Sequence, residues 1–263
     1  MKKLITLAVV GMLAVSTLTG CGQGNSGDTF TVGFDAEFPP YGYRDENGEY
    51  VGFDLDLAAE VAERNGWELV KQPIEWTAKD MELESEAIDC IWNGFTMNGR
   101  EEQYTWSKPY VDNSQVFVVA ADSGISTKSD LEGKVVAVQK DSSALKALND
   151  EEKAENIALR DSFAELIEYA DYNTAFMDLE QGAVEAVAID IGVAQYQIEK
   201  REAGAYVMLE EKLATEQYGV GFLLGNEKLR DTVQATLDEM LTDGTFMEIA
   251  EKWGLADSVC LGK

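Results

Sequence analysis

The sequence predicts an α/β fold in two lobes, each built on a mostly parallel sheet flanked by helices. Strand-like and helix-like segments alternate along nearly the whole chain, which is typical of a parallel α/β sheet. The alternation falls into two successive groups of strand–helix–strand units. Roughly 235 residues follow the N-terminal segment, which is enough for two lobes between which the chain passes twice.

Residues 1–20 resemble a secretory signal peptide. Lys2 and Lys3 precede an uncharged, mostly apolar run that is short for a membrane-spanning helix. The run leads into "LTGC", which resembles the lipobox of bacterial lipoproteins, so we expect Cys21 to carry a lipid anchor. Residues 21–28 then form a flexible tether. A plain secreted protein with a chance cysteine is the alternative.

In the first half of the folded chain, apolar runs and turn residues mark each element. The prolines at 39–40 end any regular element, the Asn-Gly pair at 47–48 indicates a hairpin, and the pair at 65–66 stops a helix. We expect strands over 30–34, 67–76 and 88–95, and helices over 54–67 and 77–87.

The second half repeats the pattern. We expect a strand over 114–120, a loop with a short helix over 124–133, and a strand, a loop and a helix over 134–148, with this helix extended toward Asn156. A strand–helix–strand unit should follow over 164–190 and a helix over 191–204. The last elements should be a strand over 217–224 and two helices over 227–254. Lobe one should comprise 29–112 and 215–263, and lobe two 113–214. The hinge crossings should lie near 110–114 and 213–218.

Composition excludes several classes of function. The chain has 49 acidic and 21 basic residues; without Lys2 and Lys3 the balance is 19 − 49 = −30, so nucleic acid is not an expected partner. The absence of histidine excludes a Ser-His-Asp triad and a His-ligated metal site, and no cofactor is expected. Cys90 and Cys260 allow either one disulfide or two free thiols.

The stretch "WNGFTMNGR" is the first candidate binding segment. The strand over 88–95 runs into Gly94 and Thr96, and ligands of α/β sheets bind beyond the carboxyl ends of strands. Arg100 follows within reach, and its planar guanidinium matches the two oxygens of a carboxylate. The alternative is a surface arginine paired with Glu101 or Glu102.

Five segments in order resemble the bacterial solute-binding proteins of polar amino acid ABC transporters, the extracellular solute-binding protein family 3. They are "FDAEFPPYGYRDENGEYVGFDLDLAAEVAERNG", "IDCIWNGFTMNGREEQYTWSKPYVDNSQVFVV", "DLEGKVVAVQKDSSA", "GAVEAVAIDIGVA" and "EQYGVGFLLGNEKLRDTVQATLDEMLTDGTFMEIAEKWG". The resemblance covers residues 29 to about 255 and implies a two-lobed, periplasmic-binding-protein-like fold of type II.

The resemblance also implies a function. The protein would be exported and anchored by lipid to the outer face of the bacterial cell membrane. There it would capture a free polar L-amino acid and deliver it to the permease and ATPase subunits of an ABC importer. An enzyme of the same fold, similar to cyclohexadienyl dehydratase, is the alternative, but no residue stands out as its general acid or base. A receptor sensor domain is a third possibility.

By this resemblance, one ligand contacts both lobes. Arg100 would hold the α-carboxylate, with Gly94 and Thr96 beside it and Ser142 and Ser143 facing it from the second lobe. Asp190, at the end of its strand, would receive the α-ammonium. Burying a zwitterion requires both charges to be paired, so binding would close the lobes. From the residues alone, a helix cap is the better interpretation of Asp190.

The ligand side chain would lie between Phe38 and Trp76, with Asp35 near its far end. A carboxylate and two aromatic rings favour cationic or amide side chains. Core aromatics and a turn acid are the alternatives for these three residues. Two features depart from the family pattern: the loop "TMNGR" is one residue short, which Gly99 must absorb, and Asp141 stands where a glycine is common.

Overall fold

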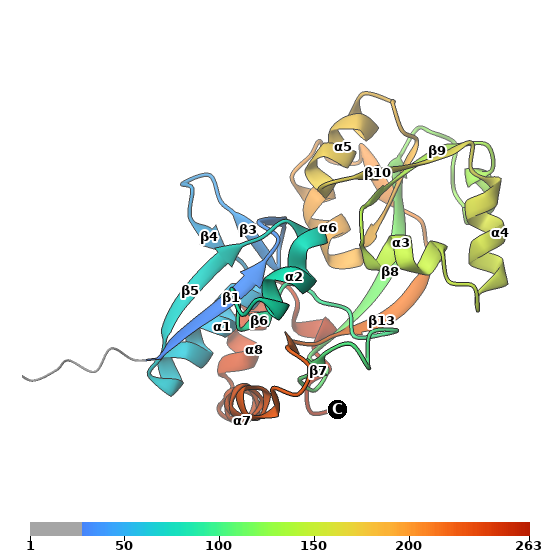
Figure 1. The fold of residues 1–263 in the computed structure, drawn as a ribbon. Helices are drawn as coiled ribbons and strands as arrows, with labels where there is room; N and C mark the ends of the chain where they lie inside the picture. Colours follow the sequence, from blue (N-terminus) through green and yellow to red (C-terminus); the bar gives the residue numbers. More distant parts are fainter. Residues whose placement is uncertain (1–27) are drawn as a thin grey trace, which may run out of the picture.

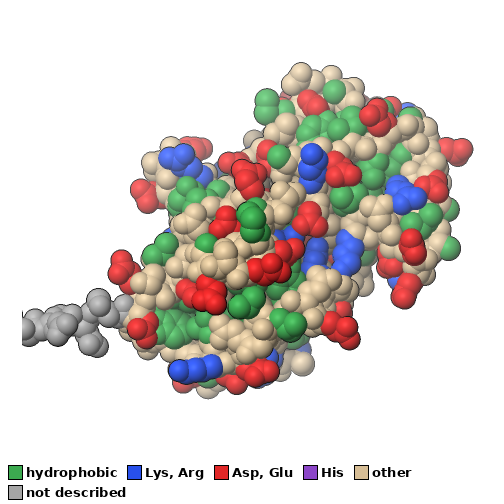
Figure 2. Space-filling view, viewed as in Figure 1, with side chains coloured by type: hydrophobic (Ala, Val, Ile, Leu, Met, Phe, Trp, Pro, Cys, Tyr) green, Lys and Arg blue, Asp and Glu red, His purple; other side chains and the backbone are tan. Residues whose placement is uncertain are grey.

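The computed structural model describes residues 28–263, which form two α/β lobes side by side (Figure 1). The predicted signal peptide, Cys21 and most of the tether lie outside the described residues. Within the described part of the chain, no helix is long and apolar enough to cross a membrane. Acidic side chains are spread over the face shown in Figure 2 and do not gather into one patch.

The first lobe contains a five-stranded sheet. Its order is β5 (Glu68–Pro73), β1 (Thr29–Phe34), β6 (Cys90–Ile91), β14 (Gly221–Phe222) and β7 (Thr105–Trp106). Its helices are α1 (Phe53–Asn65), α2 (Lys79–Glu84), α7 (Glu227–Asp243) and α8 (Thr245–Lys252). Helix α1 buries Leu57, Ala58, Val61 and Ala62, and it ends where Gly66 adopts φ +69°.

The second lobe contains a six-stranded sheet. Its path is β10 (Glu165–Tyr169), β9 (Val135–Gln139), β11 (Ala186–Asp190), β8 (Val111–Ala120) and β12 (Tyr206–Met208), and β13 (Ala214–Tyr218) also pairs with β8. Its helices are α3 (Ser143–Leu148), α4 (Ala154–Ser162), α5 (Tyr172–Glu180) and α6 (Ile191–Glu199).

Both sheets are mixed. The pairs β5–β1 and β1–β6, and likewise β10–β9 and β9–β11, are parallel, as the βαβ patterns predict. The remaining pairs are antiparallel, because the chain returns between the lobes through β8 and β13, which lie antiparallel to each other. Figure 1 shows these two long strands running from one lobe toward the other.

The lobes are packed against each other. A small sheet of β2 (Glu37–Phe38), β3 (Gly42–Arg44) and β4 (Tyr50–Val51) projects from the first lobe. The ring centroids of Phe38 and Tyr172 on α5 lie 6.1 Å apart, and those of Tyr43 and Tyr196 on α6 lie 5.4 Å apart. One hydrophobic cluster therefore includes residues of both lobes, so the structure is a closed conformation.

The structure corrects several predicted boundaries. The strand predicted over 88–95 ends at Ile91, because the chain then turns and Gly94 adopts φ +55°. The strand predicted over 217–224 divides, since β13 belongs to the second sheet and β14 to the first. Helix α3 stops at Leu148, and α4 is a separate helix. Trp76 lies in a 3₁₀ turn, not at the end of β5.

Candidate functional site: a cleft between the lobes

Arg100 is a buried cation without an acidic partner. Its side chain is 6% exposed, and within residues 28–263 no carboxylate lies within 4.0 Å of it. Nη1 donates to the Thr96 carbonyl and to the Ser143 hydroxyl, both at 3.2 Å. Because Nε and Nη2 make no hydrogen bond in that part of the chain, the guanidinium can still bind a carboxylate.

The segment before Arg100 is a tight turn. The Arg100 N–H donates to the Met97 carbonyl at 2.9 Å, and Gly99 adopts φ +71°, so a glycine absorbs the short loop. Gly94 N–H donates to the buried Asp54 carboxylate at 2.6 Å, so this N–H is occupied. The Thr96 hydroxyl donates to Glu216 at 2.9 Å.

Asp190 lies at the end of β11, and its carboxylate points into a polar network. It accepts from Asn113 at 2.8 Å, from Gln115 at 2.7 Å and from the Tyr218 hydroxyl. The residue occupies the N-cap position of α6, yet its side chain makes no cap bond. Burial, followed by the nearby Glu216, raises the pKa of Asp190 to about 7.

The expected side-chain pocket is already filled by protein groups. Asp35 accepts from Gln139 of the second lobe at 2.8 Å and from its neighbour Glu37 N–H at 2.9 Å, and burial raises its pKa to about 6. Phe38 is buried. Trp76 is half-buried, and its indole N–H donates to the Asp141 carbonyl at 3.2 Å.

The second-lobe loop reaches across to the first lobe. Ser142 caps α3 by accepting from Leu145 N–H at 3.1 Å, which leaves Ser143 to face Arg100. Asp141 adopts φ +55°, a conformation that favours glycine. Its carboxylate forms an ion pair with Lys79 of α2, whose side chain is 2% exposed.

A small cavity lies where these groups meet. Six predicted site residues and two others line it: Phe38, Trp76, Gly94, Ser142, Ser143 and Asp190, together with Asn93 and Gln139. Its volume is about 10 Å³, which holds about one water molecule. An amino acid needs far more room, so the lobes must separate before one can enter.

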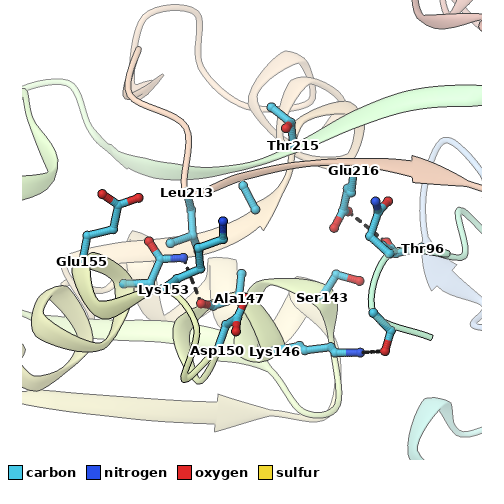
Figure 3. Close-up of a pocket in the computed structure, with 14 residues that line it drawn as sticks. Thr96, Ser143, Lys146, Ala147, Asp150, Lys153, Glu155, Leu213, Thr215 and Glu216 are labelled. Carbon is cyan, nitrogen blue, oxygen red and sulfur yellow. Dashed lines mark hydrogen bonds between the residues drawn. The ribbon is translucent and has the colours of Figure 1, made fainter. Parts of the chain in front are cut away.

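A larger groove of about 410 Å³ opens beside this cavity. Figure 3 shows Thr215 and Glu216 of β13 on one side and Ser143 and Lys146 of α3 on another, with Thr96 close to Glu216. The Lys146 ammonium donates to the Gly99 carbonyl, and its pKa is lowered by burial and then by Arg100. The groove therefore brings a second cation, Lys146, close to Arg100, while Asp150, Glu155 and Glu216 also line it.

Sequence reasoning missed five polar residues of the site. They are Lys79, Asn113, Gln115, Gln139 and Glu216. One signal was available for Glu216, because it alternates with Ala214 and Tyr218 in the hinge segment and should share their face of a strand. Among residues 28–263, Cys90 and Cys260 are both buried and form no disulfide, and no acidic or cysteine cluster suited to a metal occurs there.

The comparisons with known proteins cover nearly the whole folded chain. L-cystine-binding protein TcyJ of Escherichia coli is 28% identical over 264 residues, spanning 95% of this chain and 96% of that protein. Arginine-binding extracellular protein ArtP of Bacillus subtilis is 27% identical, spanning 96% of this chain and 98% of that protein.

A solved structure and a family model agree with these relatives. An ABC uptake transporter substrate-binding protein from Streptococcus pneumoniae, with bound histidine, has a TM-score of 0.83 and 33% identity, covering 88% of this chain and 94% of that one. The two-lobed α/β fold is confirmed, and the matches are binding proteins by name, which gives the dehydratase alternative no support. Because the family model also matches residues 30–256, the chain belongs to the bacterial extracellular solute-binding proteins, family 3.

Proposed function

We propose that this protein captures a free amino acid between its lobes and delivers it to an ABC importer. The observation that carries the proposal is the buried guanidinium of Arg100. Its Nε and Nη2 make no hydrogen bond among residues 28–263, and the Ser143 hydroxyl of the second lobe lies 3.2 Å from its Nη1. An α-carboxylate would supply the missing negative charge and bridge the two lobes. Asp190 would pair with the α-ammonium, and Gly94, Thr96 and Ser142 would complete the surroundings of the charged groups.

In this proposal the lobes are 29–112 with 215–263, and 113–214. The antiparallel strands β8 and β13 would form the hinge between them. Ligand entry would require opening, because the closed cavity of about 10 Å³ is too small for an amino acid. Contacts that the ligand makes with both lobes would then favour closure.

We propose further that the preferred side chain is cationic or carries an amide. Phe38 and Trp76 line the small cavity, and Asp35 lies behind Gln139, which also lines it. A ligand group with N–H donors could take the place of the Gln139 amide on Asp35, whereas a second carboxylate would be repelled. The names of relatives that bind arginine, cystine and histidine are compatible with a polar ligand.

A binding screen tests the proposal. Thermal-shift measurements with all free amino acids, followed by calorimetry, should find a ligand that raises the unfolding midpoint by mass action. A competition series of arginine, lysine, histidine, glutamine, cystine, glutamate and leucine then ranks side chains. If no free amino acid bound, the receptor proposal would be wrong. If glutamate or leucine bound most tightly, only the role given to Asp35 would be wrong.

We also propose export and lipid anchoring through Cys21. The family is extracellular, and the "LTGC" sequence ends in this cysteine. Growth with an alkyne analogue of palmitate should label the wild-type protein in the membrane fraction, and Cys21→Ala should abolish the label. Equal labelling of both proteins would exclude Cys21 as the attachment site, and label on neither would exclude lipidation.

A further inference from the structure

Two buried carboxylates at the hinge share the same two amide donors. Asn113 Nδ2 lies 2.8 Å from Asp190 Oδ1 and 2.6 Å from Glu216 Oε1. Gln115 Nε2 lies 2.7 Å from each of the same two oxygens. Asp190 is 3% exposed and Glu216 8% exposed. The two acids are therefore neighbours in one solvent-excluded site, although they come from different strands.

This site has more acceptors than donors. Besides the two carboxylates, Asn113 Oδ1 and Gln115 Oε1 are buried and have no hydrogen-bond partner among residues 28–263. None of the ion pairs found in that part of the chain involves Asp190 or Glu216. A group with several N–H donors and a positive charge would satisfy what the protein leaves unmatched, and an ammonium has three donors.

Glu216 also determines how the Thr96 hydroxyl can bond to a ligand. The Thr96 hydroxyl has a single hydrogen, and it donates this hydrogen to Glu216 Oε1 at 2.9 Å. The lone pairs of the hydroxyl oxygen are then left to accept from another group. Figure 3 shows the hydrogen bond between these two side chains, both of which line the groove. Without Glu216, the hydroxyl could rotate and present its hydrogen to the ligand.

We propose that Glu216 is a positioning and specificity-determining residue of the ammonium subsite, acting beside Asp190 and through Thr96. It makes the subsite select ligands that carry an α-ammonium over those that lack one. The same arrangement links binding to a proton. Without a cation, the buried Asp190 carboxyl shares its two amide donors with a second carboxylate and keeps a fraction of a proton; when an ammonium arrives, Asp190 ionises and that proton passes to solvent. This inference rests on the proposed function.

The other titratable groups near Asp190 are not the source of this proton. Tyr218 on β13, Tyr41 next to β2 and Tyr172 on α5 all face Asp190, and burial raises the pKa of each phenol well above its ordinary value. They stay neutral near pH 7. Asp54 lies near Tyr41 and Asp35 near Tyr172, one step farther from the pair. Asp190, whose pKa burial raises to about 7, is the group left to exchange the proton.

The test compares two ligands on two proteins. The ligand pair is the amino acid found in the screen and the same molecule with hydrogen in place of its amino group. For arginine the second compound is 5-guanidinopentanoic acid, and for histidine it is 3-(imidazol-4-yl)propanoic acid. Calorimetry on Glu216→Gln should show the amino acid weakened by about 10-fold to 100-fold and the deamino compound changed by less than about 2-fold.

Matched variants isolate the effect. Glu210→Gln removes the same charge from an exposed position on the preceding loop and should change neither affinity. Thr96→Val removes the proposed acceptor and should reproduce the selective loss, so the proposal remains testable if Glu216→Gln folds poorly. A purely structural role would weaken both ligands equally in Glu216→Gln, and that result would overturn the proposal.

A proton count provides the second readout. Binding enthalpies measured at pH 7 in phosphate and in Tris, whose ionisation enthalpies differ, give the protons released per ligand. The wild type should release a measurable fraction of a proton, and Glu216→Gln should release less. Identical counts would contradict the linkage. Failure of the wild type to bind any amino acid would instead defeat the proposed function, so the two failures are distinguishable.

Discussion

Arg100 has an unusual environment for a charged residue in this protein. Its guanidinium is buried against the Phe95 ring, 5.3 Å from ring centroid to Cζ, and it contacts a carbonyl and a hydroxyl but no acid among the described residues. Leaving a buried cation without a counter-ion is unfavourable, so this side chain lowers the stability of the ligand-free closed state. The missing counter-ion therefore favours the closed state that contains a ligand carboxylate over the closed state without one.

Arg100→Ala should therefore affect binding far more than folding. We expect the affinity for the amino acid to fall by about a hundredfold to several thousandfold, which corresponds to about 3–5 kcal/mol for a buried charge pair. The unfolding midpoint without ligand should stay the same or rise. Arg160→Ala, which removes an arginine paired with Asp161 on the second lobe, should leave affinity unchanged. Near-wild-type affinity in Arg100→Ala, measured by calorimetry, would contradict the assignment.

Buried carboxyl groups give the ligand-free protein a distinct pH dependence. Burial raises the pKa of Asp35 to about 6 and those of Asp54 and Asp190 to about 7, from an ordinary value of 3.8. A carboxyl with a higher pKa in the folded state binds more protons folded than unfolded. Its contribution to stability is complete below pH 3.8 and is lost as the pH rises through 6 to 7.

We expect the free energy of unfolding to fall between pH 5 and pH 8, and Asp54→Asn to reduce that fall. Each unit of pKa difference corresponds to about 1.4 kcal/mol. Denaturant titrations without ligand at the two pH values measure the effect. Glu63→Gln, an exposed acid on the same helix, should keep the wild-type dependence. A stability that rises with pH over this range would show that burial does not control these groups.

At the level of single residues, sequence patterns could predict groups that follow strand ends. Arg100, Thr96 and Asp190 are of this kind, and the structure places each one at or beside the cleft. Gln139 is the last residue of β9, as Asp190 is of β11, so it could have been found in the same way. Lys79 could not be found this way. It acts through Asp141 in the opposite lobe, and such a pairing depends on how the lobes close, which no local pattern encodes.

Among the elements, α6 determines how closely the lobes approach. Its first turn contains Gly192, and a Cβ added there would lie 2.5 Å from the Tyr41 hydroxyl oxygen of the first lobe. Real Cβ atoms do not come this close, and Tyr41 is itself held against Tyr218. A residue without a side chain is therefore required where α6 meets the first lobe.

Gly192→Ala should weaken ligand binding without destabilising the ligand-free protein. Alanine favours a helix by about 1 kcal/mol over glycine, so α6 itself gains stability. Full closure, however, would require Tyr41 to shift, so we expect affinity to fall by at least about 10-fold. Calorimetry measures the affinity, and thermal denaturation without ligand measures the stability.

A second substitution checks the cause. Tyr41→Phe removes the hydroxyl that an alanine Cβ would meet, so the double variant Gly192→Ala with Tyr41→Phe should recover part of the lost affinity relative to Tyr41→Phe alone. No recovery would mean that the glycine is needed for another reason, such as the backbone at the start of α6.

Elements with a strong apolar period were predictable, and the connections between lobes were not. Helix α1 and the parallel strands β1, β9 and β11 follow directly from their patterns. The sequence predicts one strand where the structure has β13 and β14, because apolar residues continue through both. They are separate strands because β13 pairs within the second sheet and β14 within the first. The two-residue strand β7 is too short to produce a pattern.

In the whole molecule, several direct polar bonds join the two lobes across the cleft. Under the proposed lobe boundaries these are Lys79 with Asp141, Lys146 with the Gly99 carbonyl, Gln139 with Asp35, and Asn173 with Glu37. Lys79 is the most buried of the cations that take part, at 2% exposure, while the carboxylate of Asp141 is about half exposed. This pair is therefore the clearest target for shifting the balance between closed and open forms.

Lys79→Met should open the ligand-free protein. Methionine keeps the length of the side chain but removes the charge, and a partly exposed pair contributes up to about 1 kcal/mol, or about a fivefold change in the closed-to-open ratio. Small-angle scattering should show a larger radius of gyration without ligand. Lys108→Met breaks an exposed pair within the first lobe, with Asp238, and should not change the radius. Equal radii for Lys79→Met and wild type would mean that the pair does not hold the cleft.

The bond between Lys79 and Asp141 also has a consequence for the speed of capture. Both partners are side chains of the protein, one from each lobe, so the bond stabilises the loaded and the unloaded closed forms alike. While most unloaded molecules are open, a stronger bond tightens binding. Once most are closed, affinity no longer rises, and only the fraction of molecules able to receive a ligand continues to shrink. Beyond that point, a stronger bond makes uptake slower without making it tighter.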